Sequence, residues 1–227
     1  MLRAAGSAKT IAVRGGYAGI LGVTMIGVSF AINSGPAPDA TSEQLIEFGR
    51  AHFSTIMWGA WLQAVGPGLI IVFALSVVYL AGAMQSLMGW LTMFGAGVLM
   101  MVSLTEVVFY IAALNSNYAP MAIVSNDVAH AVQHLYFIVA APALFLPLGA
   151  VLLGSPVLPR AFGFLAMALG AAFFLLGISS LTMLTLSAAV TSLAAVQAFW
   201  WLAAAITLKR RGQKMVEPEG LQCLPVR

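Results

Sequence analysis

The sequence predicts an all-α membrane protein: a polytopic bundle of six transmembrane helices with both termini in the cytoplasm. Three observations support this fold class. Hydrophobic residues make up 61% of the 227-residue chain and charged residues only 7%, whereas soluble domains hold about 25% charged residues. Six apolar runs are long enough to cross the hydrocarbon core of a bilayer, which takes about 20 residues. The basic residues gather on one side of these runs, as the positive-inside rule requires.

The same composition excludes several other classes of protein. Only seven charged residues fall between residues 15 and 208, too few to cover the surface of a soluble domain. A disulfide scaffold would be rich in cysteine, whereas this chain has one, Cys223. The net charge of +3 does not indicate a nucleic-acid partner, because the basic residues lie mostly near the ends. The lipid bilayer is therefore the expected partner.

Each predicted span is expected to be helical, because backbone groups in lipid have to be hydrogen-bonded within their own segment. We place the spans at about 15–33, 56–82, 88–114, 127–153, 160–181 and 187–208. A polar stretch without charges, around 181–187, separates the last two. The predicted domains are a cytoplasmic basic N-terminus over 1–14, a transmembrane domain over 15–208 and a cytoplasmic basic tail over 209–227.

The charges set the orientation of the spans. Six spans put both termini on one side of the membrane. Nine basic residues fall on that side and only Arg50 falls on the other. The termini are therefore expected in the cytoplasm.

The first span carries Gly15, Gly19 and Gly22, a stripe of small residues that suits close helix packing. As an alternative, residues 1–33 form a cleaved signal peptide, since a basic start precedes an apolar core. We favour a retained span, because a discarded segment would not need a packing stripe.

The first outer loop has a helix start signal. Residues 41–44, Thr-Ser-Glu-Gln, match a capping box and predict a short helix along the outer surface before the second span. Within the second span, Pro67 has no N–H and leaves the carbonyl of Gln63 without its helical donor. Pro142 does the same to Ile138 in the fourth span. Such kinks are common in carriers and also in inert bundles.

Polar side chains inside the spans mark the candidate site, because an ionisable group in lipid costs a few kcal/mol or more unless it is satisfied. Glu106 is about eight residues from the outer end of the third span, roughly 12 Å deep. Asp127, His130 and His134 open the fourth span at spacings that put them on one helix face. The candidate ion- or proton-binding residues are Glu106, His130, His134, Asp127, His52, Tyr110 and Gln63.

These residues are expected to meet in the outer half of the bundle. The third span rises to the outer surface and the fourth descends after a loop of about a dozen residues, so the two are expected to be antiparallel neighbours. Glu106 and His134 reach similar depths, and we expect their Cβ atoms within about 8 Å of each other. The polar face of the fourth span is expected to turn inward, because lipid would reject it.

Several roles remain open for this cluster. His130 and His134 are four residues apart, and with Glu106 they could ligate a transition metal ion, while a haem could lie between His52 and His134. Without a metal, imidazoles beside a carboxyl group form a proton-responsive cluster, since histidine ordinarily changes charge near neutral pH. The plainer alternatives are a helix–helix clasp at Glu106, a first-turn anion at Asp127 capped by neighbouring residues, and an interfacial His52.

Two stretches resemble a bacterial integral-membrane family of six to seven helices that is known only as a domain of unknown function. They read Leu146-Pro147-Leu148-Gly149 and Val157-Leu158-Pro159-Arg160-x-x-Gly163, with Gly170 in the helix that follows. The segment from Phe53 through Gln63 to Tyr79 is similar too. The resemblance implies that His134 matches a family histidine before the Leu-Pro-Leu-Gly helix end and that Glu106 matches a family glutamate. It implies a fold and no established activity.

The expected protein is a multi-pass protein of a bacterial inner membrane, best described as a small carrier or sensor with a proton- or ion-responsive cluster. The first alternative is a membrane metal-binding protein or metalloenzyme that uses the same cluster. The second is a structural or assembly protein without chemistry. The chain has no recognisable catalytic motif, which favours a non-enzymatic role, and it implies no cofactor beyond the metal ion of the first alternative.

Overall fold

Six helices in the described part of the chain are long and apolar enough to cross a membrane, and they confirm the predicted helix bundle. The computed structural model describes residues 2–33, 40–180 and 187–214, and these contain no strand. Its helices are α1 (Leu2–Ile32), α2 (Ser42–Ala51), α3 (Phe53–Leu80), α4 (Leu87–Asn115), α5 (Ala119–Leu135), the π-helical turn η1 (Tyr136–Ala140), α6 (Ala141–Leu153), α7 (Arg160–Ser180) and α8 (Ser187–Lys214). The segments α5, η1 and α6 form one continuous span.

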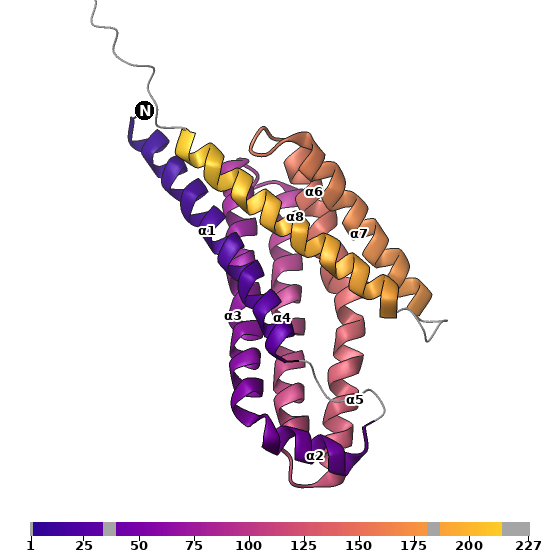
Figure 1. Ribbon diagram of the computed structural model, residues 1–227. Helices are drawn as coiled ribbons and strands as arrows, with labels where there is room; N and C mark the ends of the chain where they lie inside the picture. The colour runs from indigo at the N-terminus through magenta and orange to yellow at the C-terminus, as the bar shows by residue number, and fades with distance from the viewer. Residues whose placement is uncertain (1, 34–39, 181–186, 215–227) are drawn as a thin grey trace, which may run out of the picture.

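The start of α1 and the end of α8 lie at the same end of the bundle, which we call the terminal end (Figure 1). The short helix α2 lies across the opposite end, below α4 and α5, and we call this the α2 end. Thr41 caps α2 through a complete capping box with Gln44, as the sequence predicts. Six spans with both ends of the described chain on one side agree with the predicted topology.

The glycine stripe of α1 is used inside the bundle. A Cβ atom at Gly22 would lie 2.7 Å from the carbonyl oxygen of Gly66 on α3, and one at Gly19 would lie 2.7 Å from the Cβ of Ala205 on α8. Gly15 is equally close to Ser76 on α3. Because glycine has no side chain at these three positions, the backbone of α1 can lie directly against α3 and α8.

Large aromatic side chains fill the core where α3, α6, α7 and α8 meet. Phe73, Phe145, Phe173 and Trp201 are all at most 2% exposed. Their rings contact one another in edge-to-face, tilted and stacked arrangements; the centroids of Phe145 and Trp201, for example, are 5.1 Å apart. This half of the bundle is an apolar, fully packed region.

Two of the prolines that were expected to perturb a span, Pro67 and Pro142, coincide with local changes in hydrogen bonding. Pro67 lies inside α3, and the hydroxyl of Ser103 on α4 donates to the carbonyl of Gln63 that Pro67 leaves free. Before Pro142 the chain forms η1, in which the N–H of Ala141 bonds to the carbonyl of Tyr136, five residues earlier. The backbone of η1 also approaches Gly177 of α7, where a Cβ would lie 2.8 Å from the Cα of Ile138.

The start of the fourth span was predicted wrongly. The helix begins at Ala119 rather than near residue 127, so the loop after α4 has three residues instead of about a dozen. Asp127 is therefore not a first-turn residue, and the first turn of α5 contains no acidic side chain. Pro120 explains the early start, because proline is well suited to the first turn of a helix. The prediction placed the start at residue 127 because the polar face of the helix was interpreted as a capping sequence.

The outer limits of the first and last spans also differ from the prediction. α1 begins at Leu2 and α8 continues to Lys214, so part of each predicted basic end is helical. Basic side chains favour the last turn of a helix, where they complement the helix dipole, and this explains the longer α8. Residues 181–186 of the predicted boundary and Cys223 fall outside the described residues.

Candidate functional site

Glu106 is the centre of a polar cluster between three helices. Its carboxyl oxygen Oε1 accepts a hydrogen bond of 2.9 Å from the side-chain amide of Gln133 on α5. The side-chain amide of Gln63 on α3 lies close enough to interact with the same carboxyl group. Glu106 itself is half-buried on α4. One neutral amide thus hydrogen-bonds the carboxyl group, and a second from another helix lies beside it.

His130 is a histidine that lies close enough to Glu106 to interact with it electrostatically. It stands one turn before Gln133 on α5, toward the α2 end, which is why the two side chains share a helix face. Its Nδ1 atom lies 3.3 Å from the amide nitrogen of Asn126, one further turn away. The cluster therefore extends from Glu106 toward the α2 end along α5.

Two tyrosines continue the polar arrangement around Glu106. The hydroxyl of Tyr136 in η1 donates to the side-chain oxygen of Gln197 on α8 at 2.6 Å. The hydroxyl of Tyr110 on α4 donates to the side-chain oxygen of Asn33, just after α1, at 3.0 Å. Both tyrosines are near enough to Glu106 to be affected by its charge. Side chains from α3, α4, α5 and η1 thus lie near the carboxyl group.

The structure brings together only some of the predicted site residues. Glu106, Gln63, His130 and Tyr110 belong to the cluster, and Glu106 contacts Gln133 where His134 was expected. His134 is one position further along α5, and one position rotates a side chain by about 100° around the helix.

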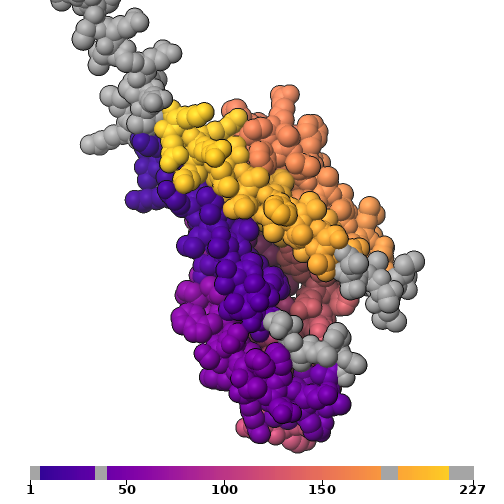
Figure 2. Space-filling model, viewed as in Figure 1, coloured from indigo at the N-terminus to yellow at the C-terminus, as the bar shows by residue number. Residues whose placement is uncertain are grey.

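Asp127, His130 and His134 are exposed, so the polar face of α5 does not turn fully inward as predicted. The reason is that α5 packs mainly on α4 and α2, which leaves its other side uncovered within the described part of the chain. In Figure 2 this segment is recessed behind α1 and α8. The exposure makes the cluster accessible from outside the bundle.

His52 has a local structural role at the junction of α2 and α3. Its Nδ1 atom lies 3.1 Å from the carbonyl oxygen of Phe48, and its ring stacks on the Phe48 ring with centroids 4.4 Å apart. This places it at the interface end of α3, away from the contacts of Glu106. Its arrangement matches the interfacial alternative.

Sequence reasoning included Gln63 but missed Gln133, the hydrogen-bond partner of Glu106. It also missed the neutral groups that bond to other residues of the cluster: Asn126, Tyr136, Gln197 and Asn33. A signal was present, because an amide inside an apolar span also needs a partner. Gln133 in particular lies three residues after His130.

A transition metal site receives no support from the geometry. Within residues 2–33, 40–180 and 187–214, no three histidine, cysteine or acidic side chains lie close enough to hold one ion. The predicted set of His130, His134 and Glu106 is therefore not assembled here. The groups nearest to the Glu106 carboxyl are amides, which are weak ligands for such metals.

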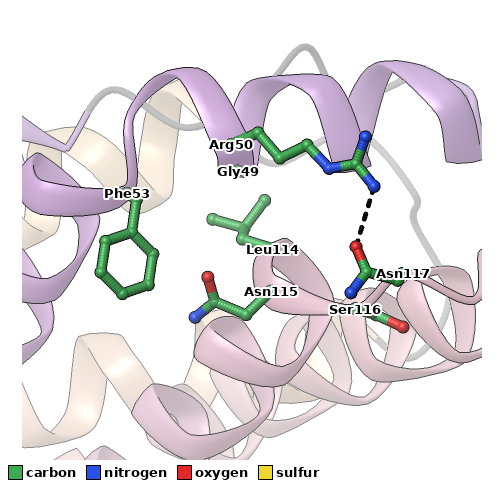
Figure 3. A pocket seen from close by; sticks show the side chains of 7 residues that line it. All are labelled: Gly49, Arg50, Phe53, Leu114, Asn115, Ser116 and Asn117. Atoms are coloured by element: carbon green, nitrogen blue, oxygen red, sulfur yellow. Dashed lines mark hydrogen bonds between the residues drawn. The ribbon is translucent and has the colours of Figure 1, made fainter.

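A small pocket at the α2 end shows how α2 closes the bundle (Figure 3). Its volume is about 280 Å³, and it lies between α2, the start of α3 and the end of α4. Arg50 on α2 donates a hydrogen bond of 2.9 Å to the side-chain oxygen of Asn117, in the loop before α5. A Cβ at Gly49 would overlap the carbonyl of Leu114, so α2 lies directly against α4. This contact fixes α2 over the end of the bundle that is nearest to Glu106.

No family model, curated protein or solved structure matches this chain. The function is therefore inferred from the residues of this chain alone.

Proposed function

We propose that this protein is a small inner-membrane carrier or sensor in which Glu106, with His130 beside it, binds a proton or a small cation. The observation that carries the proposal is the amide environment of the Glu106 carboxyl group, with Gln133 as its hydrogen-bond partner and Gln63 close to it. Neither amide carries a charge that would hold the carboxyl group in one protonation state.

Amide partners suit a group that gains and loses a proton. A glutamine donates its N–H to an ionised carboxylate and accepts through its oxygen from a protonated carboxyl group. The same two residues can therefore satisfy Glu106 in both states after a rotation of the amide. An arginine or lysine in their place would hold the ionised form. The site is thus suited to exchange a proton at modest energetic cost.

The proposed route for the ion begins at the α2 end. From there the polar groups follow α5 in the order Asn126, His130, Gln133 and Tyr136, a distance of roughly 15 Å along the helix. Beyond Tyr136 and its partner Gln197 the bundle becomes the apolar aromatic core. A polar route that ends at mid-membrane fits a sensor, or one state of an alternating-access carrier, better than an open channel.

The proposed orientation follows the charges. The terminal end carries nearly all basic residues of the chain, which favours the cytoplasmic side of a bacterial inner membrane. The α2 end and the exposed polar face of α5 then open toward the outside. Water covers that face in this proposal, because lipid would not solvate it.

The test compares Glu106→Gln with Asp127→Asn in protein reconstituted into lipid vesicles. Infrared difference spectra recorded over a series of pH values report carboxyl protonation. We expect the wild type and Asp127→Asn to share a protonation band from a carboxyl group in an apolar environment, and Glu106→Gln to lack it. A band that persists in Glu106→Gln, or a wild type without any such band, would contradict the proposal.

A further inference from the structure

A second pocket lies at the terminal end, on the opposite side of the membrane from the Glu106 cluster. Its volume is about 400 Å³, and it is formed by the loop between α6 and α7, the start of α7 and one side chain of α8. Three polar side chains are among its lining residues: Ser155, Arg160 and Arg211. The proposed function makes no use of this pocket.

Arg211 shapes the pocket by holding the loop. Its Nη1 atom donates to the carbonyl oxygens of Pro156 and Val157, at 2.6 Å and 3.1 Å. A guanidinium group has five N–H donors, and these two bonds occupy only those of Nη1. The N–H groups of Nη2 and Nε remain for another acceptor. One rigid cation is therefore fixed at the wall of the pocket.

Ser155 supplies an independent sign of a missing partner. Its hydroxyl oxygen is shielded from solvent and has no hydrogen-bond partner, and it is the one side-chain atom in the described residues with this combination. Buried polar atoms in folded proteins are rarely left in this state, and a bound ligand, water or ion is one explanation for such a case. Since Ser155 also lines the pocket, an acceptor bound there would complete its hydrogen bonding.

The charges around the pocket favour an anion. No acidic residue occurs between Asp127 and Glu217 in the sequence, and the acidic side chains of the described residues lie on α2, α4 and α5. Arg160 and Arg211 thus face the pocket without a nearby carboxylate from the described part of the chain. Arg160 is also the first residue of α7, where backbone N–H groups lack helical acceptors and attract anions.

We propose that this pocket binds a phosphate group, held by Arg160, Arg211 and the hydroxyl of Ser155. Arginine matches phosphate oxygens in geometry as well as in charge. The pocket lies where α7 begins, at the level of the membrane headgroups, and basic pockets at this level bind anionic lipids. The phosphate is supplied either by an anionic phospholipid headgroup or by inorganic phosphate from solution.

The experiment measures retention of lipid by delipidated full-length protein, with native mass spectrometry and thermal unfolding in detergent. The probes are phosphatidylglycerol, phosphatidylcholine and inorganic phosphate. Arg160→Gln removes a pocket cation that does not hold the loop, and Arg210→Gln, an exposed neighbour of Arg211 outside the pocket, is the matched control. Ser155→Ala tests the hydroxyl separately.

We expect phosphatidylglycerol to bind more tightly than phosphatidylcholine, and Arg160→Gln to weaken its binding about tenfold, the usual effect of losing a charge-assisted hydrogen bond. Ser155→Ala should weaken binding about threefold, and Arg210→Gln should leave it unchanged. If inorganic phosphate alone stabilises the wild type and displaces the lipid, free phosphate is the ligand. Equal effects of Arg160→Gln and Arg210→Gln would overturn the proposal. So would the absence of a preference for the two anionic probes, phosphatidylglycerol and inorganic phosphate, over the zwitterionic phosphatidylcholine.

Discussion

The hydroxyl of Ser103 on α4 donates a hydrogen bond of 3.2 Å to the backbone carbonyl of Gln63 on α3. Pro67 cannot supply the usual helical donor to this carbonyl, so the bond from α4 replaces the missing one. The side chain of the same Gln63 lies beside Glu106, one turn after Ser103 on α4. The proline in α3 and the polar cluster are thereby joined through a single residue.

Ser103→Ala should destabilise the protein by about 1 kcal/mol, since interhelical hydrogen bonds in membranes are worth this much or somewhat less. The change leaves the Gln63 carbonyl without a donor. Thr105→Ala is the control, because the Thr105 hydroxyl bonds only to the Met101 carbonyl of its own helix. Unfolding in a denaturing detergent measures both. Equal losses in the two variants would show that the bond between α3 and α4 has no special importance.

Glu106→Gln should keep the fold within about 1 kcal/mol of the wild type, since an amide can still pair with Gln133. Glu106→Ala should cost about 2 kcal/mol, because it leaves the Gln133 amide without its partner. The same unfolding measurement compares them. If Gln proves as disruptive as Ala, the carboxyl group is ionised and paired with a cation, and the exchange proposed here is wrong.

Gly22→Ala should destabilise the bundle by roughly 2 kcal/mol, the usual range for overpacking. The new Cβ would lie 2.7 Å from the backbone oxygen of Gly66, which has no flexible end that could move away. Gly27→Ala is the matched change on the same helix, since nothing lies within 4 Å of a Cβ there. It should stabilise α1 by about 0.5 kcal/mol. Thermal unfolding distinguishes the two, and a loss of stability in both would contradict the packing explanation.

Acid should weaken the start of α2. Backbone N–H donation and hydrogen bonds from Ser42 and Thr41 hold the pKa of Glu43 below its usual range. A lowered pKa means that the ionised form stabilises the folded helix; this contribution is present above the ordinary carboxyl pKa and is lost as pH falls through the lowered value. The protection of the α2 amides, that is, their exchange rate relative to that of an unstructured peptide at the same pH, should therefore decrease at acid pH in the wild type. In Glu43→Gln the protection should lose this pH dependence.

Cys223 provides a test of the proposed orientation. It is the single thiol of the chain and follows the basic end of α8, outside the described residues. A membrane-impermeant maleimide should leave it unmodified in intact cells and modify it after lysis. Modification in intact cells would place the terminal end outside.

The spans were predictable because length and hydropathy alone decide whether a helix can cross lipid. The glycine stripe of α1 was predictable for a similar reason, since its spacing is a local property of one helix. The start of α5 was not, because residues 125–127 match a helix cap in sequence and lie within a helix in the structure. Only the packing of α5 against α4 and α2 distinguishes the two cases.

The candidate site was predictable in depth and not in angular position. Glu106 was placed at the level where α5 meets it, since depth follows from counting residues along a helix. Which side chain of α5 points at Glu106 depends on rotation about the helix axis, which tertiary packing sets. Gln133 rather than His134 makes the contact for this reason.

The π-helical turn η1 allows α5 to take that rotation while α6 keeps its own packing. A π-turn holds about one residue more than the α-helix it interrupts, so α5 is rotated by about 100° relative to a continuous α-helix leading into α6. In a continuous helix His134 would take the angular position that Gln133 has. A single additional residue at 136–140 therefore selects an uncharged amide over an imidazole as the neighbour of the Glu106 carboxyl group. The backbone conformation one turn away from this polar cluster thus influences which side chain contacts the Glu106 carboxyl group.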